Sequence, residues 1–374
     1  MTDDIARAWA YLSRVAEPPC PELAELVAAV GPVEAVDHVV RGKVGVPLAR
    51  DTEARRQIDC AAKDLEVLSR LGGRLVTSED DEWPLLAFAA FDGVGARQRP
   101  RGRPPMVLWV VGPGNLRDVA DRAAAIVGTR ASTAYGEYVA GDLADGLAGR
   151  DVAVVSGAAY GIDGAAHRAA LAADGLTVAV LAGGIDVPYP AGHAALLHRI
   201  REEGLVVSEY PPGVRPARHR FLTRNRLVAA LAGATVVVEA GARSGAANTA
   251  AWARALGRAV CAVPGPVTSS ASVGCHALLR GEANLVTRAE DVVELVGRAG
   301  ELAPDEQRPV SPLDGLGDTE QRVYDALPAR GARTPDEIAV ASGLPATQVL
   351  GPLAVLELSG LVVCQDGRWK LALR

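Results

Sequence analysis

The densest positive charge in the sequence lies between Tyr210 and Ala230, where five arginines and one histidine occur without an acidic residue. The formal net charge of the whole chain is −6, so this basic run is a local feature. Arg224 and Arg226 flank Asn225, and we expect this R-N-R motif to lie at a helix start. Guanidinium groups and the free N–H groups of a helix start both bind phosphate. The run therefore predicts a site for a polyanion.

Three further loops combine glycine with hydroxyl or guanidinium side chains. They are IVGTR with Gly128, Thr129 and Arg130, the loop that opens at Ser156 and Gly157, and ARSGAANT with Arg243, Ser244, Gly245 and Thr249. Glycine lets the backbone approach a ligand, and each loop precedes a predicted helix whose first N–H groups attract anions. A single nucleotide needs one such loop, whereas a row of loops suits a strand of several phosphates.

Acid–base chemistry has fewer candidates in this sequence. Asp163 and His167 are four residues apart and share a helix face, where they form either an acid–base pair or a structural hydrogen bond that holds the loop. The glycine spacing of this loop departs from the dinucleotide fingerprint G-x-G-x-x-G, which disfavours NAD. No cluster of His, Cys and Asp has ligand spacing. We therefore predict no catalytic residue, no metal and no cofactor.

The elements that must position these loops form a regular series from Leu108 to about Val293. Short β-branched runs, each followed by a glycine-containing loop and an Ala/Leu-rich helical stretch, are AAAIVG, VAVVSG, TVAVLAGG, LVVSEY, ATVVVEAG and RAVCAVPG. Such repetition predicts an α/β fold with a parallel sheet and helices on both faces. Ligands of such sheets bind outside the carboxyl ends of the strands, where these loops fall.

Pattern changes along the chain predict four segments. Residues 1–70 are expected to be helical, 71–298 to form the domain that contains the sheet, 299–317 to be a linker and 318–374 to be a winged helix. Within the second segment, residues 71–114 look irregular, and RQRPRGRPP is expected to be an exposed loop. The winged helix is predicted from three helices and two short strands around Asp366-Gly367, a favoured hairpin turn. Its third helix has no Lys or Arg, which favours a protein contact over reading duplex DNA.

Composition limits the class of protein. No apolar stretch reaches the length of a membrane span, and the N-terminus has no signal-peptide pattern, so we expect a cytoplasmic protein without a membrane partner. The five cysteines are far apart and never form C-x-x-C, so buried structural thiols are expected rather than disulfides or a zinc site. Aromatic residues make up 4% of the chain, which limits base stacking to a few side chains such as Tyr160, Tyr189 and Phe221.

The ordered motifs IVGTR, VVSGAAYGIDGAAH, TVAVLAGGIDVPYP, GLVVSEYPPG, RFLTRNRLVAAL, TVVVEAGARSGAANTA and AVPGPV together resemble the DNA-processing protein A family (DprA, also called Smf). The resemblance covers residues 108–287 densely. It implies an extended Rossmann-like domain flanked by an N-terminal helical domain of the SAM or HhH type and a C-terminal winged helix. It also implies a homodimer that binds and protects single-stranded DNA, and that loads the RecA recombinase during natural transformation and recombination.

The resemblance places Arg130, the Ser156-Gly157 loop, Arg224, Arg226 and the Ser244-Gly245 loop in a DNA pocket. The full set of DNA-binding residues that we predict is Gly128, Thr129, Arg130, Ser156, Gly157, Arg220, Arg224, Asn225, Arg226, Arg243, Ser244, Gly245 and Thr249.

The alternative to a DNA-binding protein is an enzyme on a related fold, a nucleotide phosphoribohydrolase. Glu239, Asp163 and His167 would supply its acid–base groups. Such enzymes carry a P-G-G-x-G-T-x-x-E loop, and the corresponding stretch EAGARSGAANTA lacks the downstream Glu. The sequence therefore favours a DNA-binding protein that is not an enzyme.

Overall fold

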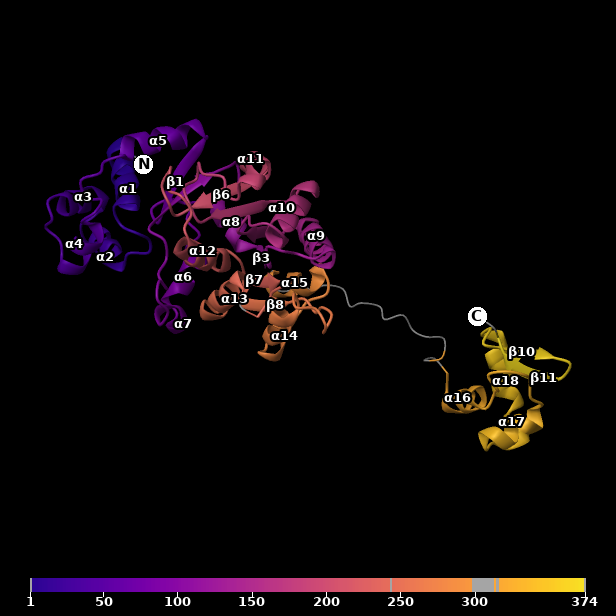
Figure 1. Ribbon diagram of the computed structural model, residues 1–374. Helices are drawn as coiled ribbons and strands as arrows, with labels where there is room; N and C mark the ends of the chain where they lie inside the picture. Colours follow the sequence, from indigo (N-terminus) through magenta and orange to yellow (C-terminus); the bar gives the residue numbers. More distant parts are fainter. Residues whose placement is uncertain (1, 243, 298–312, 314–315, 373–374) are drawn as a thin grey trace. The chain divides into compact units, whose positions relative to one another are not determined.

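Nine short strands form one sheet at the centre of the larger part of the protein (Figure 1). The computed structural model describes residues 2–242, 244–297, 313 and 316–372. The strands are β1 (Gly73–Thr77), β2 (Val107–Val111), β3 (Ala123–Val127), β4 (Ala153–Ser156), β5 (Thr177–Leu181), β6 (Leu205–Ser208), β7 (Ala234–Val237), β8 (Ala259–Ala262) and β9 (Asn284–Leu285). The six runs predicted as strands are β3 to β8, which confirms that part of the sequence analysis.

The order of the strands is β1-β2-β6-β5-β4-β3-β7-β8-β9. All pairs from β6 to β9 in this order are parallel, and only β1–β2 and β2–β6 are antiparallel. The chain runs outward from β3 through β4 and β5 to β6, then returns to the other side of β3 at β7. This reversal is the topological switch point at which open parallel sheets bind their ligands.

Helices cover both faces of the sheet because successive side chains of a strand point to opposite faces. In β3, Ala124 and Ile126 pack into the same cluster as helices α9, α10 and α15, whereas Ala125 and Val127 pack into the cluster of α12 and α13. The helices of this part are α6 (Leu85–Ala89), η1 (Ala90–Asp92), α7 (Val94–Arg97), α8 (Leu116–Asp121), α9 (Ala134–Ala148), α10 (Ile162–Ala172), η2 (Ala191–His193), α11 (Ala194–Glu203), α12 (Arg218–Ala230), α13 (Gly245–Ala255), α14 (Val273–Arg280) and α15 (Ala289–Val296).

The N-terminal segment is helical, as predicted, and shares its core with the sheet. Its helices are α1 (Asp3–Val15), α2 (Pro21–Val30), α3 (Pro32–Val40), α4 (Val46–Thr52) and α5 (Ala61–Arg70). Trp9 and Leu12 of α1 belong to one buried cluster with Trp109 of β2 and Val206 of β6. These helices and the sheet accordingly belong to one compact unit, Met1–Ala303, and the second unit is Pro304–Arg374.

The interpretation of residues 71–114 as irregular is wrong. They contain β1 and β2, which extend the sheet beyond β6 in the antiparallel sense, with Gly73 paired with Val111. The segment RQRPRGRPP is largely exposed, but its arginines hold it against α12 and α13. The guanidinium carbon of Arg99 lies 4.3 Å from the Trp252 ring centroid, and Arg101 Nη1 donates to Thr223 Oγ1 at 2.9 Å.

The second unit is a winged helix, as predicted. It contains α16 (Asp318–Asp325), α17 (Pro335–Ser342), η3 (Ala346–Gln348), α18 (Leu350–Leu358), β10 (Val362–Gln365) and β11 (Arg368–Leu371). The two strands are antiparallel, and their turn has positive φ at Asp366 and Gly367. Most of the linker predicted at 299–317 lies outside the described residues.

Candidate nucleic-acid interface

A cleft of about 850 Å³ opens at the carboxyl ends of the parallel strands. Its walls come from the loops after β3, β4, β5, β6 and β7, with the first turns of α12 and α13. Nine of the predicted residues line it: Gly128, Thr129, Arg130, Gly157, Arg224, Asn225, Ser244, Gly245 and Thr249. The sheet therefore brings together loops that lie more than 100 residues apart in the sequence.

The turn after β3 presents Arg130 at the cleft. Thr129 N–H donates to the Glu239 carbonyl oxygen at 2.8 Å, which ties this turn to the end of β7. Gly161, with φ of +75°, packs so closely below the turn that a Cβ there would lie 2.4 Å from the Thr129 carbonyl oxygen. Arg130 itself is exposed, and its guanidinium carbon lies 5.0 Å from the Phe221 ring centroid. A fixed backbone thus carries a cation that remains open to a ligand.

Arg224 forms the floor of the cleft from the second turn of α12. It is 6% exposed, and Nη1 donates to the Val180 carbonyl oxygen at 2.5 Å. Burial lowers the pKa of Arg224 to about 10, an effect that the nearby Asp163 carboxylate opposes. The guanidinium therefore stays charged at neutral pH. A Cβ on Gly157 would lie 2.1 Å from Arg224 Nη1, so glycine is needed for this arrangement.

Asp163 is the single acidic residue among those that line the cleft. Its Oδ2 accepts from Gly157 N–H at 3.1 Å and from Ala159 N–H at 3.4 Å, so the carboxylate holds the loop after β4. Burial raises the pKa of Asp163 and the Arg224 charge lowers it. Three arginines, Arg130, Arg218 and Arg224, line the cleft beside this one carboxylate, so basic side chains outnumber acidic ones among its lining residues.

The start of α13 supplies uncharged donors. Ser244 is its N-cap and accepts from Ala247 N–H at 3.2 Å. Asn225 Nδ2 donates to the Gly245 carbonyl oxygen at 3.3 Å, which joins α12 to α13. The first turns of α12 and α13 both face the cleft, and their free N–H groups add positive potential to that of the arginines. Arg243 lies outside the described residues.

Three predicted residues do not line the cleft. Ser156 is fully buried and donates to the Ile126 carbonyl oxygen at 2.6 Å. Arg220 is paired with Glu17, with Nε 2.6 Å from Oε1. Arg226 is 0% exposed, and its Nη2 lies 2.6 Å from Glu209 Oε1. The helix also begins at Arg218, so Arg224 and Arg226 lie well inside α12 and the expected helix start at R-N-R is wrong.

Other residues line the cleft although the predicted set omits them. Arg218 is exposed at the first residue of α12, and Phe221 follows one turn later. Tyr189 lies with its ring centroid 5.2 Å from that of Phe221. Arg218 belongs to the basic run, and Tyr189 and Phe221 were expected only as candidates for base stacking. A predicted helix start at Arg218 would have indicated that Arg218 and Phe221, in the first turn of α12, also lie at the cleft.

The acid–base groups of the enzymatic alternative have structural partners. Glu239 is buried and accepts from Thr133 N–H at 2.9 Å and Thr133 Oγ1 at 2.6 Å, at the start of α9. His167 Nδ1 lies 2.7 Å from Thr177 Oγ1, and burial lowers the pKa of His167 to about 3. Asp163 and His167 therefore do not pair with each other. Neither His167 nor Glu239 lines the cleft.

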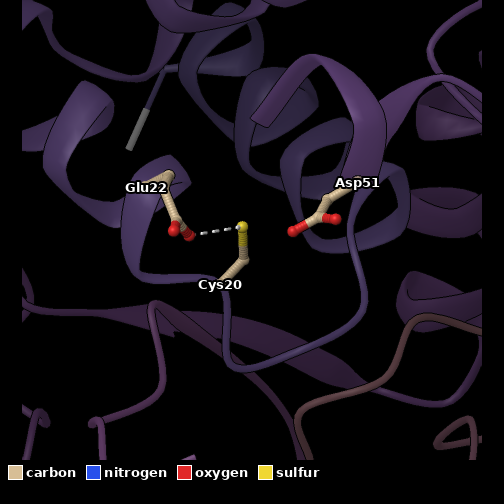
Figure 2. Close-up of side chains that lie close together, drawn as sticks. All are labelled: Cys20, Glu22 and Asp51. Atoms are coloured by element: carbon tan, nitrogen blue, oxygen red, sulfur yellow. Dashed lines mark hydrogen bonds between the residues drawn. The ribbon is translucent and has the colours of Figure 1, made fainter. Parts of the chain in front are cut away.

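One group of potential metal ligands occurs among the described residues, and it lies in the N-terminal segment. Figure 2 shows Cys20 between Glu22 and Asp51, with ligand atoms within 4.8 Å of one another. Burial raises the pKa of the Cys20 thiol, which disfavours the thiolate that binds metals. None of the three residues lines the cleft. All five cysteines are free, and Cys20, Cys261 and Cys275 are buried.

Among the described residues, no single helix has the length and apolar character needed to cross a membrane. One sharply bent pair of helices, Pro335–Ser342 with Ala346–Leu358, meets the criterion by length and composition alone.

The fold and the cleft define a Rossmann-like protein with an arginine-lined cleft at the carboxyl edge of its sheet. Residues 74–297 match the family described as DNA recombination-mediator protein A, and residues 306–368 match the DprA winged helix domain. The chain is 72% identical over 371 residues to the putative DNA processing protein DprA of Mycobacterium tuberculosis, which covers 99% of this chain and 95% of the relative. The chain therefore belongs to the DNA recombination-mediator protein A (DprA/Smf) family.

Two solved structures support the same assignment. DNA processing protein A from Streptococcus pneumoniae matches with a TM-score of 0.63 and 29% identity, over 78% of this chain and 98% of that one. DNA processing protein A from Helicobacter pylori, whose structure concerns its single-stranded DNA binding mode, matches with a TM-score of 0.51 and 27% identity. This match covers 59% of this chain and 94% of the Helicobacter pylori chain. The expected family and fold class are confirmed.

Proposed function

We propose that this protein binds single-stranded DNA in the cleft, mainly through the phosphates, and that it is not an enzyme. The observation that carries the proposal is the charge of the cleft. Arg130, Arg218 and Arg224 face the same space as the first turns of α12 and α13. The one acidic lining residue, Asp163, is engaged by backbone amides and by the Arg224 charge. Such an arrangement binds a chain of phosphates without reading its sequence.

The aromatic residues of the cleft favour a single strand over a duplex. Tyr189 is 41% exposed and lies beside Phe221. Their rings can stack on a base only where the face of that base is free, as it is in a single strand. The Helicobacter pylori relative, whose structure concerns single-stranded DNA binding, supports the same choice of ligand.

The proposal includes delivery of the bound strand to the RecA recombinase by a homodimer, as the family resemblance implies. RecA-catalysed strand exchange on DNA covered by a single-strand-binding protein should be faster with this protein present. The dimer is supported by an open edge of the sheet, since β9 is the last strand and both of its residues are exposed. Analytical ultracentrifugation over a range of concentrations measures the oligomeric state.

The test of DNA binding is a fluorescence-anisotropy titration of oligothymidine and of a duplex at several salt concentrations. The wild type should prefer the single strand, and the logarithm of its affinity should fall with the logarithm of salt by about 0.7 for each neutralised phosphate. The Arg130→Ala/Arg218→Ala variant should bind more weakly, with a slope smaller by about 1.4, because both residues are exposed cations at the cleft.

The matched control is Arg117→Ala. Arg117 is exposed on α8, which leads directly into the amino end of β3, the edge opposite the cleft. This variant should bind as the wild type does. Equal affinity for duplex and single strand, or an Arg130→Ala/Arg218→Ala variant with unchanged affinity, would contradict the proposal.

A further inference from the structure

A second basic pocket lies where the N-terminal helical segment meets the loop before α12. This seam pocket has a volume of about 220 Å³, and its charged lining residues are Arg14, Glu17, Arg55, Arg215 and Arg220. Glu17 and Arg55 come from the N-terminal segment, whereas Arg215 and Arg220 belong to the basic run before and within α12. The predicted DNA-binding residue Arg220 thus lies in this pocket rather than in the cleft.

The seam pocket has a surplus of positive charge. Arg14 is paired with the buried Asp64, at 2.7 Å from Nε to Oδ2. Glu17 is shared by Arg55 and Arg220. Four guanidinium groups therefore meet two carboxylates. Arg215 is exposed, and its side chain makes no hydrogen bond within the described part of the chain.

The seam pocket and the cleft lie on two sides of the same short segment, residues 214–220. Val214, Arg215 and Arg220 line the seam pocket. Pro216, Ala217 and Arg218 line the cleft. One short segment therefore lines both spaces, and the start of α12 connects the cleft to the seam pocket.

We propose that the seam pocket binds a phosphate of the same DNA strand that occupies the cleft. The inference rests on the proposed function and deepens it, because it gives the N-terminal segment a direct contact with DNA through Arg55. Guanidinium groups hold phosphate in a bidentate fork, and Arg215 and Arg55 are the two whose donors are least engaged by carboxylates. The cleft then holds one part of the strand, and the seam pocket extends the binding site.

The experiment compares short and long oligothymidines, from a dinucleotide to about 20 nucleotides, a span that exceeds common single-strand site sizes. The Arg55→Ala/Arg215→Ala variant should bind the shortest oligonucleotides as the wild type does. For the long oligonucleotides its affinity should be lower, and its salt slope smaller by about 1.4. The control is Arg41→Ala, an exposed arginine of the N-terminal segment that is also ion-paired, to Asp37.

Arg215→Ala alone keeps the test valid if loss of Arg55 disturbs the fold. Since Arg215 is exposed, its removal should leave thermal unfolding unchanged and should reduce the salt slope for long oligonucleotides by about 0.7. Unchanged long-oligonucleotide binding in both variants would overturn the inference. In that case a loss of affinity in Arg130→Ala/Arg218→Ala would still support the proposed function, so the two failures are distinguishable.

Two further outcomes would also overturn the inference. The first is equal weakening for short and long oligonucleotides, which would mean that the seam pocket shapes the cleft instead of binding phosphate. The second concerns a free anion as the occupant. If inorganic phosphate raises the melting temperature of the wild type but not of Arg55→Ala/Arg215→Ala, while long-oligonucleotide affinity is unchanged, the pocket is a site for free phosphate.

Discussion

Arg130, Arg224 and Arg226 show how the partners of an arginine decide its role. Arg130 is exposed above Phe221, and Arg224 is buried but faces the cleft. Arg226, two residues further along α12, points into the core, where Glu209 and the Phe91 ring surround it. Successive residues of an α-helix are rotated by about 100°, so two residues that are two positions apart point to nearly opposite sides of the helix. Arg224 and Arg226 therefore face different surroundings.

Arg226 should contribute to stability rather than to DNA binding. We expect Arg226→Ala to lower the free energy of unfolding by about 3–5 kcal/mol, because it leaves the Glu209 carboxylate buried without its partner. Urea-induced unfolding followed by fluorescence measures this loss. Single-strand affinity of the folded variant should change by no more than about twofold, since Arg226 does not line the cleft.

The double variant Glu209→Gln/Arg226→Met is the control for that change. It removes both charges together, so much of the stability lost in Arg226→Ala should return. An Arg226→Ala protein with wild-type stability and a large loss of DNA affinity would mean instead that Arg226 touches DNA.

Two glycines of the cleft offer a matched pair of substitutions. A Cβ at Gly157 would collide with the Arg224 guanidinium, whereas no atom lies within 4 Å of a Cβ at Gly245. Gly157→Ala should weaken single-strand binding roughly tenfold, because the displaced Arg224 guanidinium loses the charge-assisted hydrogen bond that we propose it makes to a phosphate in the cleft. Gly245→Ala should bind normally. Equal titration curves for the two variants would show that the position of Arg224 is unimportant.

Among the described residues, the predicted loop residues line the cleft more often than the predicted arginines do. Gly128, Gly157 and Gly245 follow or precede regular elements, and such local signals are visible in the sequence. The partners of Arg226 and Arg220 are 17 and 203 positions away, at Glu209 and Glu17. No local pattern reveals pairs of this kind, so the sequence alone does not show that Arg220 and Arg226 lie outside the cleft.

At the scale of elements, α12 connects the cleft to the N-terminal segment. Glu17 accepts from Arg220 and His219 in the first turn of α12 and from Arg55 of the N-terminal segment. Burial opposes ionisation, but these hydrogen bonds outweigh it and lower the pKa of Glu17 from 4.5 to about 2. The position of the first turn of α12, and with it Arg218 and Phe221, therefore depends on an ionised Glu17.

The lowered pKa predicts a pH dependence of stability. Between about pH 4.5 and pH 2 the unfolded carboxyl of Glu17 binds a proton that the folded one does not. The stabilisation is thus complete above pH 4.5 and is lost as the pH falls towards 2. Urea unfolding at a series of pH values should show a stability difference between wild type and Glu17→Gln that shrinks over this range. A difference independent of pH would contradict this role of Glu17.

The parallel strands could be predicted because each is a short apolar run followed by glycine. β2 was harder to recognise: all five of its residues are buried, so it shows no alternation, and its partner β1 begins 34 residues earlier. The start of α12 was missed because RHRFLTRNR is so polar that it resembles a loop. Both errors concern segments whose structure depends on distant contacts rather than on local propensity.

At the scale of the whole molecule, all residues that line the cleft lie between residues 127 and 249. The loops of one sheet edge, with the first turns of α12 and α13, therefore suffice to build the cleft. The winged helix has its own core around Val323, Ile338 and Leu353. Its α18 carries no Lys or Arg, and Leu358 at its end is 90% exposed. We therefore propose protein contact, and not DNA binding, for this unit.

The central claim is that the DNA strand lies across Tyr189 and Phe221 at the carboxyl edge of the sheet. Photo-cross-linking of an oligothymidine that contains 4-thiothymidine, followed by mass spectrometry of the cross-linked peptides, tests it most directly. We predict cross-links at Tyr189 and Phe221, with a lower yield in Arg130→Ala/Arg218→Ala and an unchanged yield in Arg117→Ala. Cross-links confined to residues 316–372 of the winged helix would contradict the account.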